Sequence, residues 1–271
     1  MLARVVLLYW LGYLALATLE GPAWLARGEA LTVWFGFVAK IAPLWRERGR
    51  LTLGLPGAQI VAMPALGAGA AAFVALMLAS VCFDGLRDTF RWLAFLGLNP
   101  LEFPGRSAVV RANSLGLLAA WALTLASILA AIALGRRLAG ARRGRFRAEA
   151  GPAMLAFLPI AAGYHAAHYL TALLGNGQYL LAALNDPLHR GASLLGLPHT
   201  WVSFGFATDP AAVTRIWNAQ FALILGAHLL AVLIGLRVAG PRPAIAHLPM
   251  TVLMVAYTVF GLWLLSAPTA G

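Results

Sequence analysis

The sequence predicts an all-α protein, a polytopic integral membrane bundle of about seven transmembrane helices that forms a single transmembrane domain over residues 1–271. Composition is the first ground for this prediction. Of the residues, 61% are hydrophobic and 11% are charged, which leaves too little polar surface to cover a soluble protein of this length. The second ground is the pattern, because hydrophobic residues gather in long runs and arginines cluster between the runs.

A helix that crosses a bilayer needs about 20 mostly apolar residues, because the hydrocarbon core is ~30 Å thick and a helix rises ~1.5 Å per residue. The run at 3–19 is adequate, and we interpret it as a helix, since no small-residue cleavage site of a signal peptide follows it. The run at 23–44 contains three charged residues and can instead lie in the membrane interface. The predicted helices are 3–19, 23–44, 58–83, 112–135, 152–174, 214–236 and 247–266.

The distribution of arginines predicts the orientation in the membrane. The segment 136–150, called the basic loop below, holds six arginines against one glutamate, so it is expected in the cytoplasm. By alternation, 45–50 and 237–246 are also cytoplasmic, while 84–111 and 175–213 lie outside. We therefore expect a membrane protein with its N-terminus inside and its C-terminus outside, and this agreement favours 23–44 as a crossing.

The net charge of +11 does not indicate a nucleic-acid partner, because the arginines flank apolar runs as they do in membrane proteins. We expect the lipid bilayer as a partner and, under the alternative function given below, other membrane subunits. Cys82 is the only cysteine, so one chain can form neither an internal disulfide nor a thiolate metal cluster.

Ionisable residues within the apolar runs are candidate functional residues, because a charge in a membrane is costly. His165 and His168 share one face of the predicted helix 152–174, and His228 lies near the middle of 214–236. Asp84 ends the predicted helix 58–83. Neutral imidazoles suit zinc, copper or haem iron. The sequence thus predicts a pocket in the outer half of the bundle in which His165, His168 and His228 are metal ligands and Asp84 orients a ligand or acts as a catalytic base.

Structural roles for the same polar residues remain open. A membrane histidine often serves only as a hydrogen-bond partner between helices. Asp84 lies beside Arg87 in the sequence and can form an ion pair or a helix cap. Gln178, Asp186 and His189 belong to an external segment whose Asn-Asp-Pro sequence predicts a turn.

The chain contains no GxSxG, P-loop, HExxH or GxGxxG motif. Serine-hydrolase, nucleotide-driven and dinucleotide chemistry therefore lack their usual signatures. A pocket of histidines and carboxylates remains compatible with a metal-activated water, an axially ligated haem or a proton-coupled pathway.

Five sequence blocks resemble a family of bacterial multi-pass membrane proteins labelled fenitrothion hydrolase-like: RGEALTVWFG, SVCFDGLRDT, AHYLTALLGNGQY followed by LNDP, ILGAHLLAV and PMTVLMVAYTVFGLWLLSAPT. The resemblance covers nearly the whole chain. It implies that Asp84, His168, Gln178, Asp186 and His228 coincide with polar positions of the family. Family members are longer, so the resemblance also implies a shortened or divided version, and the family label implies phosphotriester hydrolysis.

The leading functional expectation is a metal-dependent or haem-dependent membrane enzyme, with a transition metal or haem as cofactor and with hydrolysis implied only by the family label. The alternative is a permease, or an assembly subunit of a larger membrane complex, without catalysis of its own. A separate expectation concerns packing. Small residues at Gly67, Gly69, Ala71 and Ala75 predict that the helix 58–83 lies in the interior of the bundle.

The arginine asymmetry gives a testable topology. Reporter fusions after Gly144, in the basic loop, and after Gly271 should report the cytoplasm and the periplasm, respectively. Two fusions that report the same side would show that the seven-helix prediction miscounts the crossings after the basic loop.

Overall fold

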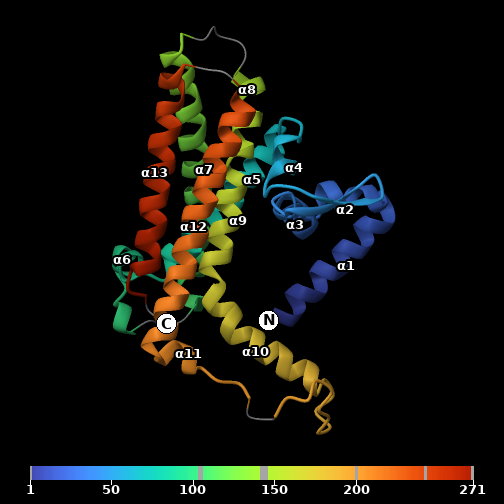
Figure 1. The fold of residues 1–271 in the computed structure, drawn as a ribbon. Helices are drawn as coiled ribbons and strands as arrows, with labels where there is room; N and C mark the ends of the chain where they lie inside the picture. The colour runs from blue at the N-terminus through green and yellow to red at the C-terminus, as the bar shows by residue number, and fades with distance from the viewer. Residues whose placement is uncertain (1, 103–105, 141–145, 199–200, 241–242, 270–271) are drawn as a thin grey trace. The chain divides into compact units, whose positions relative to one another are not determined.

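The computed structural model describes residues 2–102, 106–140, 146–198, 201–240 and 243–269. Apart from one β-hairpin and one isolated bridge, regular structure in these ranges is helical (Figure 1). The chain divides into two compact units, Met1–Ala65 and Leu66–Gly271. A single transmembrane domain stays a prediction.

The first unit contains four helices and the hairpin. Arg48 and Gly49 form the turn of the hairpin with φ values of 48° and 80°, as a two-residue connection that matches the strand twist requires. The elements of this unit are α1 (Leu2–Glu20), α2 (Pro22–Gly28), α3 (Ala30–Ala39), β1 (Leu44–Glu47), β2 (Arg50–Leu53) and α4 (Ala58–Val61).

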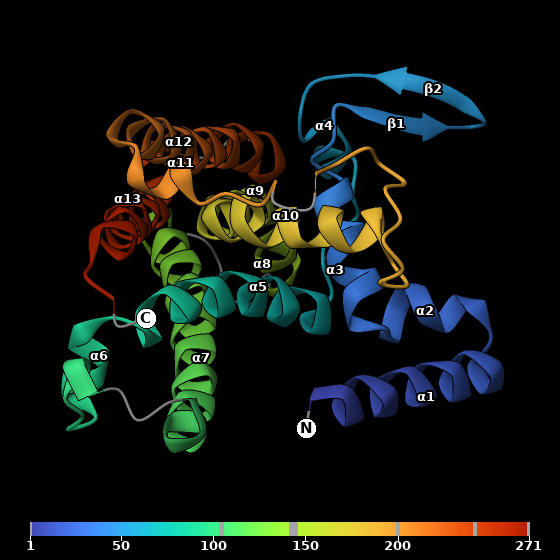
Figure 2. The same ribbon diagram turned by 90° about the horizontal axis from the view of Figure 1, so that it is seen from below.

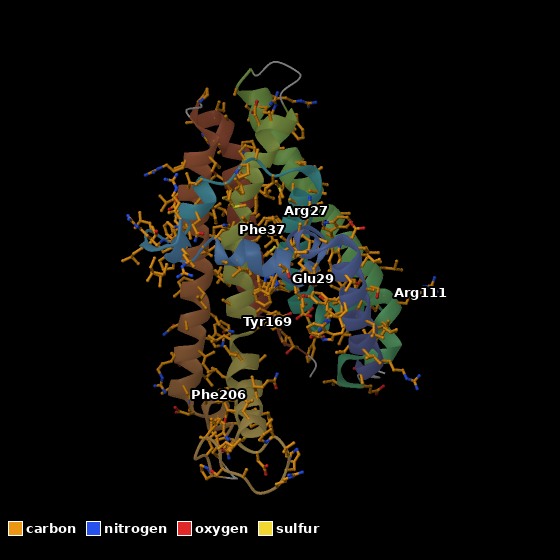
Figure 3. All side chains as sticks on the ribbon, turned by 90° about the vertical axis from the view of Figure 1, so that its right-hand side faces the viewer. Arg27, Glu29, Phe37, Arg111, Tyr169 and Phe206 are labelled. Carbon is orange, nitrogen blue, oxygen red and sulfur yellow. The ribbon has the colours of Figure 1, made fainter. Side chains whose placement is uncertain are left out.

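Glu29 interrupts the predicted helix 23–44 (Figure 3). Its backbone is extended, and its carboxylate accepts hydrogen bonds from the N–H groups of Leu31 at 2.8 Å and Thr32 at 2.5 Å. The hydroxyl of Tyr9 donates to the same carboxylate. A side chain that satisfies the free N–H groups of a helix start favours a new helix there. Two short helices, α2 and α3, therefore replace the single helix that the apolar run predicts.

The second unit is a bundle in which α5, α7, α13, α12 and α9 form a closed ring of helix contacts (Figure 2). Large apolar side chains fill its core, including Leu78, Ile128, Phe157 and Ile224. The elements are α5 (Ala68–Arg87), α6 (Phe90–Phe95), η1 (Pro100–Glu102), α7 (Arg106–Leu138), α8 (Phe146–Leu155), α9 (Phe157–His168), α10 (Leu170–Asn185), α11 (Gly205–Thr208), α12 (Pro210–Ala239) and α13 (Ala244–Ser266).

Five described helices are long and apolar enough to cross a membrane, namely α1, α5, α7, α12 and α13. This agrees with a helical protein that has membrane-like helices, but it does not reach the predicted number of seven. The predicted helix 152–174 falls instead on α8, α9 and the start of α10. Pro159 explains the first break, because proline has no N–H to donate to the carbonyl of Leu155 and its ring clashes there.

The helix predicted at 58–83 begins at Ala68 and ends at Arg87 in the structure, so Asp84 lies in its last turn. Eight of its residues are buried, as expected for an interior helix: Val74, Ala75, Met77, Leu78, Ala79, Val81, Cys82 and Phe83. The glycines at its start do not provide the close approach, since Cβ atoms built at Gly67 and Gly69 would meet no neighbour within 4 Å.

The close approach occurs between α9 and α12. A Cβ atom at Gly163 would lie 2.3 Å from the Cβ of Ala227 and 3.1 Å from the carbonyl oxygen of Leu223. Real Cβ atoms do not come this close, so the two helices can pack as they do only with glycine at this position. Small residues at such crossings allow backbones to approach in membrane bundles.

Replacing Gly163 with alanine should lower the free energy of unfolding by about 1–3 kcal/mol, because the new methyl group forces α9 and α12 apart. Gly69→Ala is the matched control, since its methyl group meets no neighbour and should leave stability unchanged or slightly higher. Denaturant titration of both variants in the same detergent measures the difference. Equal stabilities for Gly163→Ala and the parent would contradict the close contact.

Candidate functional site

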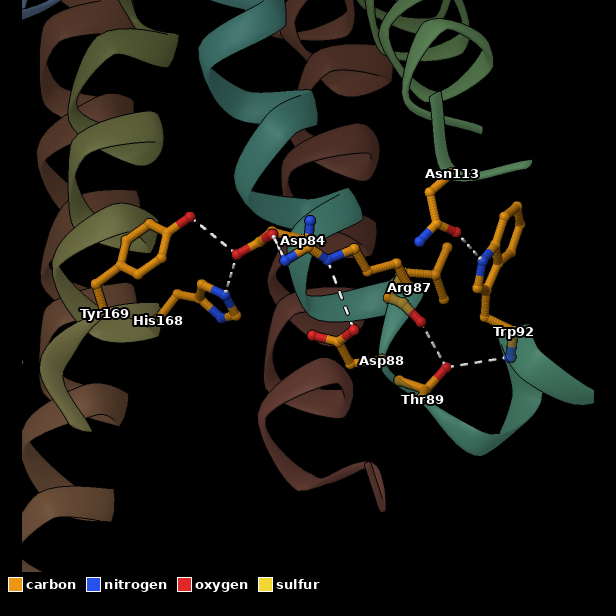
Figure 4. A network of polar contacts seen from close by, with 9 residues as sticks. Asp84, Arg87, Asp88, Thr89, Trp92, Asn113, His168 and Tyr169 are labelled. Carbon is orange, nitrogen blue, oxygen red and sulfur yellow. Dashed lines mark hydrogen bonds and ion pairs between the residues drawn. The ribbon is translucent and has the colours of Figure 1, made fainter. Parts of the chain in front are cut away.

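The last turn of α5 carries the carboxylate of Asp84, which three donors contact from two helices (Figure 4). The Nε2–H of His168 and the hydroxyl of Tyr169 each donate to Oδ2 at 2.9 Å. The guanidinium of Arg87, one turn along α5, lies 2.7 Å from Oδ1. An ionised carboxylate can accept hydrogen bonds but cannot donate them. All three contacts of Asp84 come from donors, so this arrangement stabilises Asp84 as an anion.

Asp88 extends the same group of charges beyond the end of α5. Its carboxylate lies 3.6 Å from Nε of Arg87, and half of its side chain is exposed. The Asp84 side chain is 19% exposed and the His168 side chain 29%. We call Asp84, Arg87, Asp88, His168 and Tyr169 the Asp84 cluster. It joins the ends of α5 and α9 and leaves its carboxylates accessible to a small molecule.

An open cavity of about 400 Å³ adjoins the Asp84 cluster between α5 and α7. Asn113 lies in its wall and accepts a hydrogen bond from Nε1 of Trp92 at 2.9 Å (Figure 4). Thr89 begins α6 as an N-cap that accepts from the backbone N–H of Trp92, which holds the indole in place. The cavity wall consists of Ser80, Phe83, Asp84, Arg87, Asp88, Val109, Val110, Asn113, Ser114, Leu117 and Tyr169.

The two other predicted ligands make hydrogen bonds within their own helices. Nδ1 of His165 lies 2.8 Å from the carbonyl oxygen of Ala161 on α9. His228 is buried in α12, where its Nδ1–H donates to the carbonyl of Ile224 at 2.8 Å. The ring of His228 lies 5.7 Å from that of Tyr164. Both histidines thus have contacts typical of helix packing.

The register of α9 and α12 separates His228 from His168. Nε2 of Gln220 donates to the carbonyl of Ala167 at 2.9 Å, which places the turn of α12 around Gln220 level with the end of α9. His228 lies eight residues after Gln220, which corresponds to roughly 12 Å along a helix axis. Ligands of one metal ion bind it at about 2.0–2.1 Å, so these two imidazoles do not reach a common ion.

In the part of the chain that the structure describes, no group of three His, Cys, Asp or Glu side chains is arranged to hold a metal ion. The structure therefore does not assemble the predicted site of His165, His168 and His228. It does bring Asp84 and His168 together, although they come from predicted helices that are distant in the sequence. The geometry provides a hydrogen bond between an imidazole and a carboxylate at 2.9 Å.

Gln178 and Asp186 organise the segment that follows α10. Gln178 forms a pair of hydrogen bonds with the backbone of Ser203, donating to its oxygen at 2.9 Å and accepting from its nitrogen at 2.8 Å. Asp186 accepts from the N–H groups of Arg190 and Gly191 at 2.9 and 2.8 Å. The hydrogen bond from Arg190 lowers the pKa of the Asp186 carboxyl below its ordinary value. These contacts are structural, as the turn interpretation expects.

Tyr169 and Asn113 are members of the site that sequence reasoning missed. Tyr169 directly follows His168, and an aromatic hydroxyl at the end of an apolar run was a detectable signal. Asn113 begins a long apolar run, where a polar residue looks like an ordinary helix end. Only the contact between α5 and α7 assigns it to the cavity.

Comparisons of the chain with protein-family models, with curated proteins and with solved structures found no match. The functional proposal below therefore depends on the geometry of the Asp84 cluster and its cavity.

Proposed function

We propose that the chain is an integral protein of the bacterial inner membrane that carries a small polar solute across the bilayer in exchange for a proton. In this proposal the solute binds in the cavity beside the Asp84 cluster, and the Asp84–His168 pair holds the proton. One observation carries the proposal. A carboxylate inside an apolar, membrane-length helix is hydrogen bonded to an imidazole and also lines an open cavity.

The physical support comes from the cost of such a group. Aspartate and histidine are rare within membrane spans and typically mark substrate paths or proton relays. Asp84 and His168 form such a pair, with 2.9 Å between the carboxylate oxygen and Nε2. Arg87 contacts the other oxygen of the same carboxylate at 2.7 Å, so Asp84 can accept a hydrogen bond from Nε2–H of His168 in either charge state of the imidazole.

The proposal includes seven crossings, a cytoplasmic N-terminus and a periplasmic C-terminus. Five crossings are α1, α5, α7, α12 and α13, and the other two are α2 with α3 and α8 with α9. The contacts of the second unit support the alternation. A bridge between Thr89 and Thr269 joins the ends of α5 and α13, while an ion pair between Arg136 and Glu149 joins the end of α7 to α8. The Asp84 cluster then faces the periplasm.

This proposal replaces the metal-dependent or haem-dependent enzyme as the leading function, because His228 and His168 do not reach a common ion. It is also preferred to a purely structural assembly subunit. A subunit that only packs against partners needs no open cavity walled by two carboxylates and a guanidinium.

Hydrolysis of a phosphotriester is the second candidate, and one contact favours it. A neutral His168 that donates through Nε2 to Asp84 presents an unprotonated Nδ1, which is the arrangement of a general base oriented by a carboxylate. His168-dependent release of the aryl alcohol from a dialkyl aryl phosphotriester by the purified protein would favour this candidate over transport.

The transport proposal can be tested in proteoliposomes that contain a pH-sensitive dye. Alkylamines, alcohols and phosphotriesters are added in turn, and solute-dependent movement of protons is recorded. We expect at least one solute class to drive proton movement. Asp84→Asn and His168→Gln should each reduce the rate of this proton movement by about tenfold or more, because each removes a partly buried, charge-assisted hydrogen bond.

Asp209→Asn is the control, because Asp209 is an exposed cap of α12 and asparagine preserves the cap. Its vesicles should match those of the parent. Proton movement that is the same in parent, Asp84→Asn and His168→Gln vesicles for every solute would contradict the proposal.

A further inference from the structure

The charges that line the cavity do not balance. Asp84 and Asp88 share the single guanidinium of Arg87, and these three are the charged residues of the described cavity wall. Arg87 contacts Asp84 at 2.7 Å and Asp88 only at 3.6 Å. With a neutral His168 beside it, the wall therefore carries one excess negative charge, and the carboxylate of Asp88 is the less compensated of the two.

The arginine of α6 is engaged with another side chain. Arg91, on α6, lies over the ring of Trp263, with its guanidinium carbon 5.6 Å from the ring centroid. The residues that α7 contributes to the wall are uncharged, and α9 contributes Tyr169 with His168 behind it.

Two aromatic rings and a group of aliphatic side chains complete the wall. Phe83 and Tyr169 line the cavity, and Phe83 is held by an edge contact with Trp92 at 5.2 Å. Aromatic faces attract ammonium groups by their quadrupole, most strongly where water is excluded. Val109, Val110 and Leu117 supply apolar surface opposite the carboxylates. A ligand that matches this wall combines a positive charge with apolar substituents.

We propose that the solute is an organic cation, an ammonium compound with a short apolar chain, whose charged group binds at Asp88 beside the rings of Phe83 and Tyr169. The inference rests on the proposed transport function and names its substrate class. The bound ammonium group then compensates the excess negative charge of the wall.

Binding experiments with three probes of equal chain length separate charge from hydrophobicity: hexylammonium, 1-hexanol and hexanoate. Calorimetric titration of the protein in phosphatidylcholine nanodiscs, with empty nanodiscs as the blank, removes the contribution of partition into lipid. We expect hexylammonium to bind about tenfold or more tightly than 1-hexanol, and hexanoate to bind most weakly, because a charge-assisted contact in a partly buried site has this magnitude.

Variants locate the site. Asp88→Asn should weaken hexylammonium binding by about tenfold and leave 1-hexanol binding unchanged. Asp88→Glu should retain most of the affinity for hexylammonium, because it keeps the carboxylate. This variant separates loss of the charge from misfolding caused by a substitution at Asp88. Asp209→Asn, which alters an exposed carboxylate on α12, should behave like the parent.

Equal affinity for hexylammonium and 1-hexanol, or an unchanged affinity in Asp88→Asn, would overturn the cation site. Hexylammonium binding that depends on Asp88, in a protein whose vesicles move no protons with any solute, would instead retain the cation site and contradict the proposed transport.

Discussion

The ionised carboxylate of Asp84 is the constraint on which the site depends. A carboxylate in the last turn of an apolar helix loses hydration, and the loss must be offset by hydrogen bonds and opposite charge. Arg87 supplies the charge from the same helix, and His168 and Tyr169 supply donors from the end of α9. Because these donors come from two helices, the carboxylate also fixes the contact of α5 with α9, and with it one side of the cavity.

Sequence patterns predicted the helical, membrane-like character and the polar positions better than they predicted the contacts. Apolar runs located α5, α7, α12 and α13 because their length alone distinguishes them. The prediction of single helices at 23–44 and 152–174 was wrong. Hydropathy does not register that the Glu29 side chain caps a new helix, and it does not register the hydrogen bond that is lost at Pro159.

Within the predicted polar pocket, the structure contains the contact between Asp84 and His168 but does not bring His228 to it. Depth in the membrane suggested that Asp84 and His168 meet, and they do. The same reasoning grouped His228 with them, because depth specifies neither which face of a helix is turned inward nor how two helices are aligned. Close packing at Gly163 and the hydrogen bond of Gln220 set the alignment of α9 and α12, and neither is visible before the helices are placed. The Asp84 cluster thus lies at the ends of α5 and α9, and the buried imidazole of His228 lies apart from it on α12.

A double-mutant cycle between Asp84 and His168 tests the central claim most directly. The free energies of unfolding of Asp84→Asn, His168→Gln and the double variant are measured in one detergent, with Asp84→Asn combined with Asp209→Asn as the reference pair. Residues in direct contact give coupling energies of about 0.5–3 kcal/mol, whereas distant pairs add. The account predicts coupling in this range for Asp84 with His168 and none for the reference pair. Additive effects of Asp84→Asn and His168→Gln would contradict a stabilising contact between the two side chains.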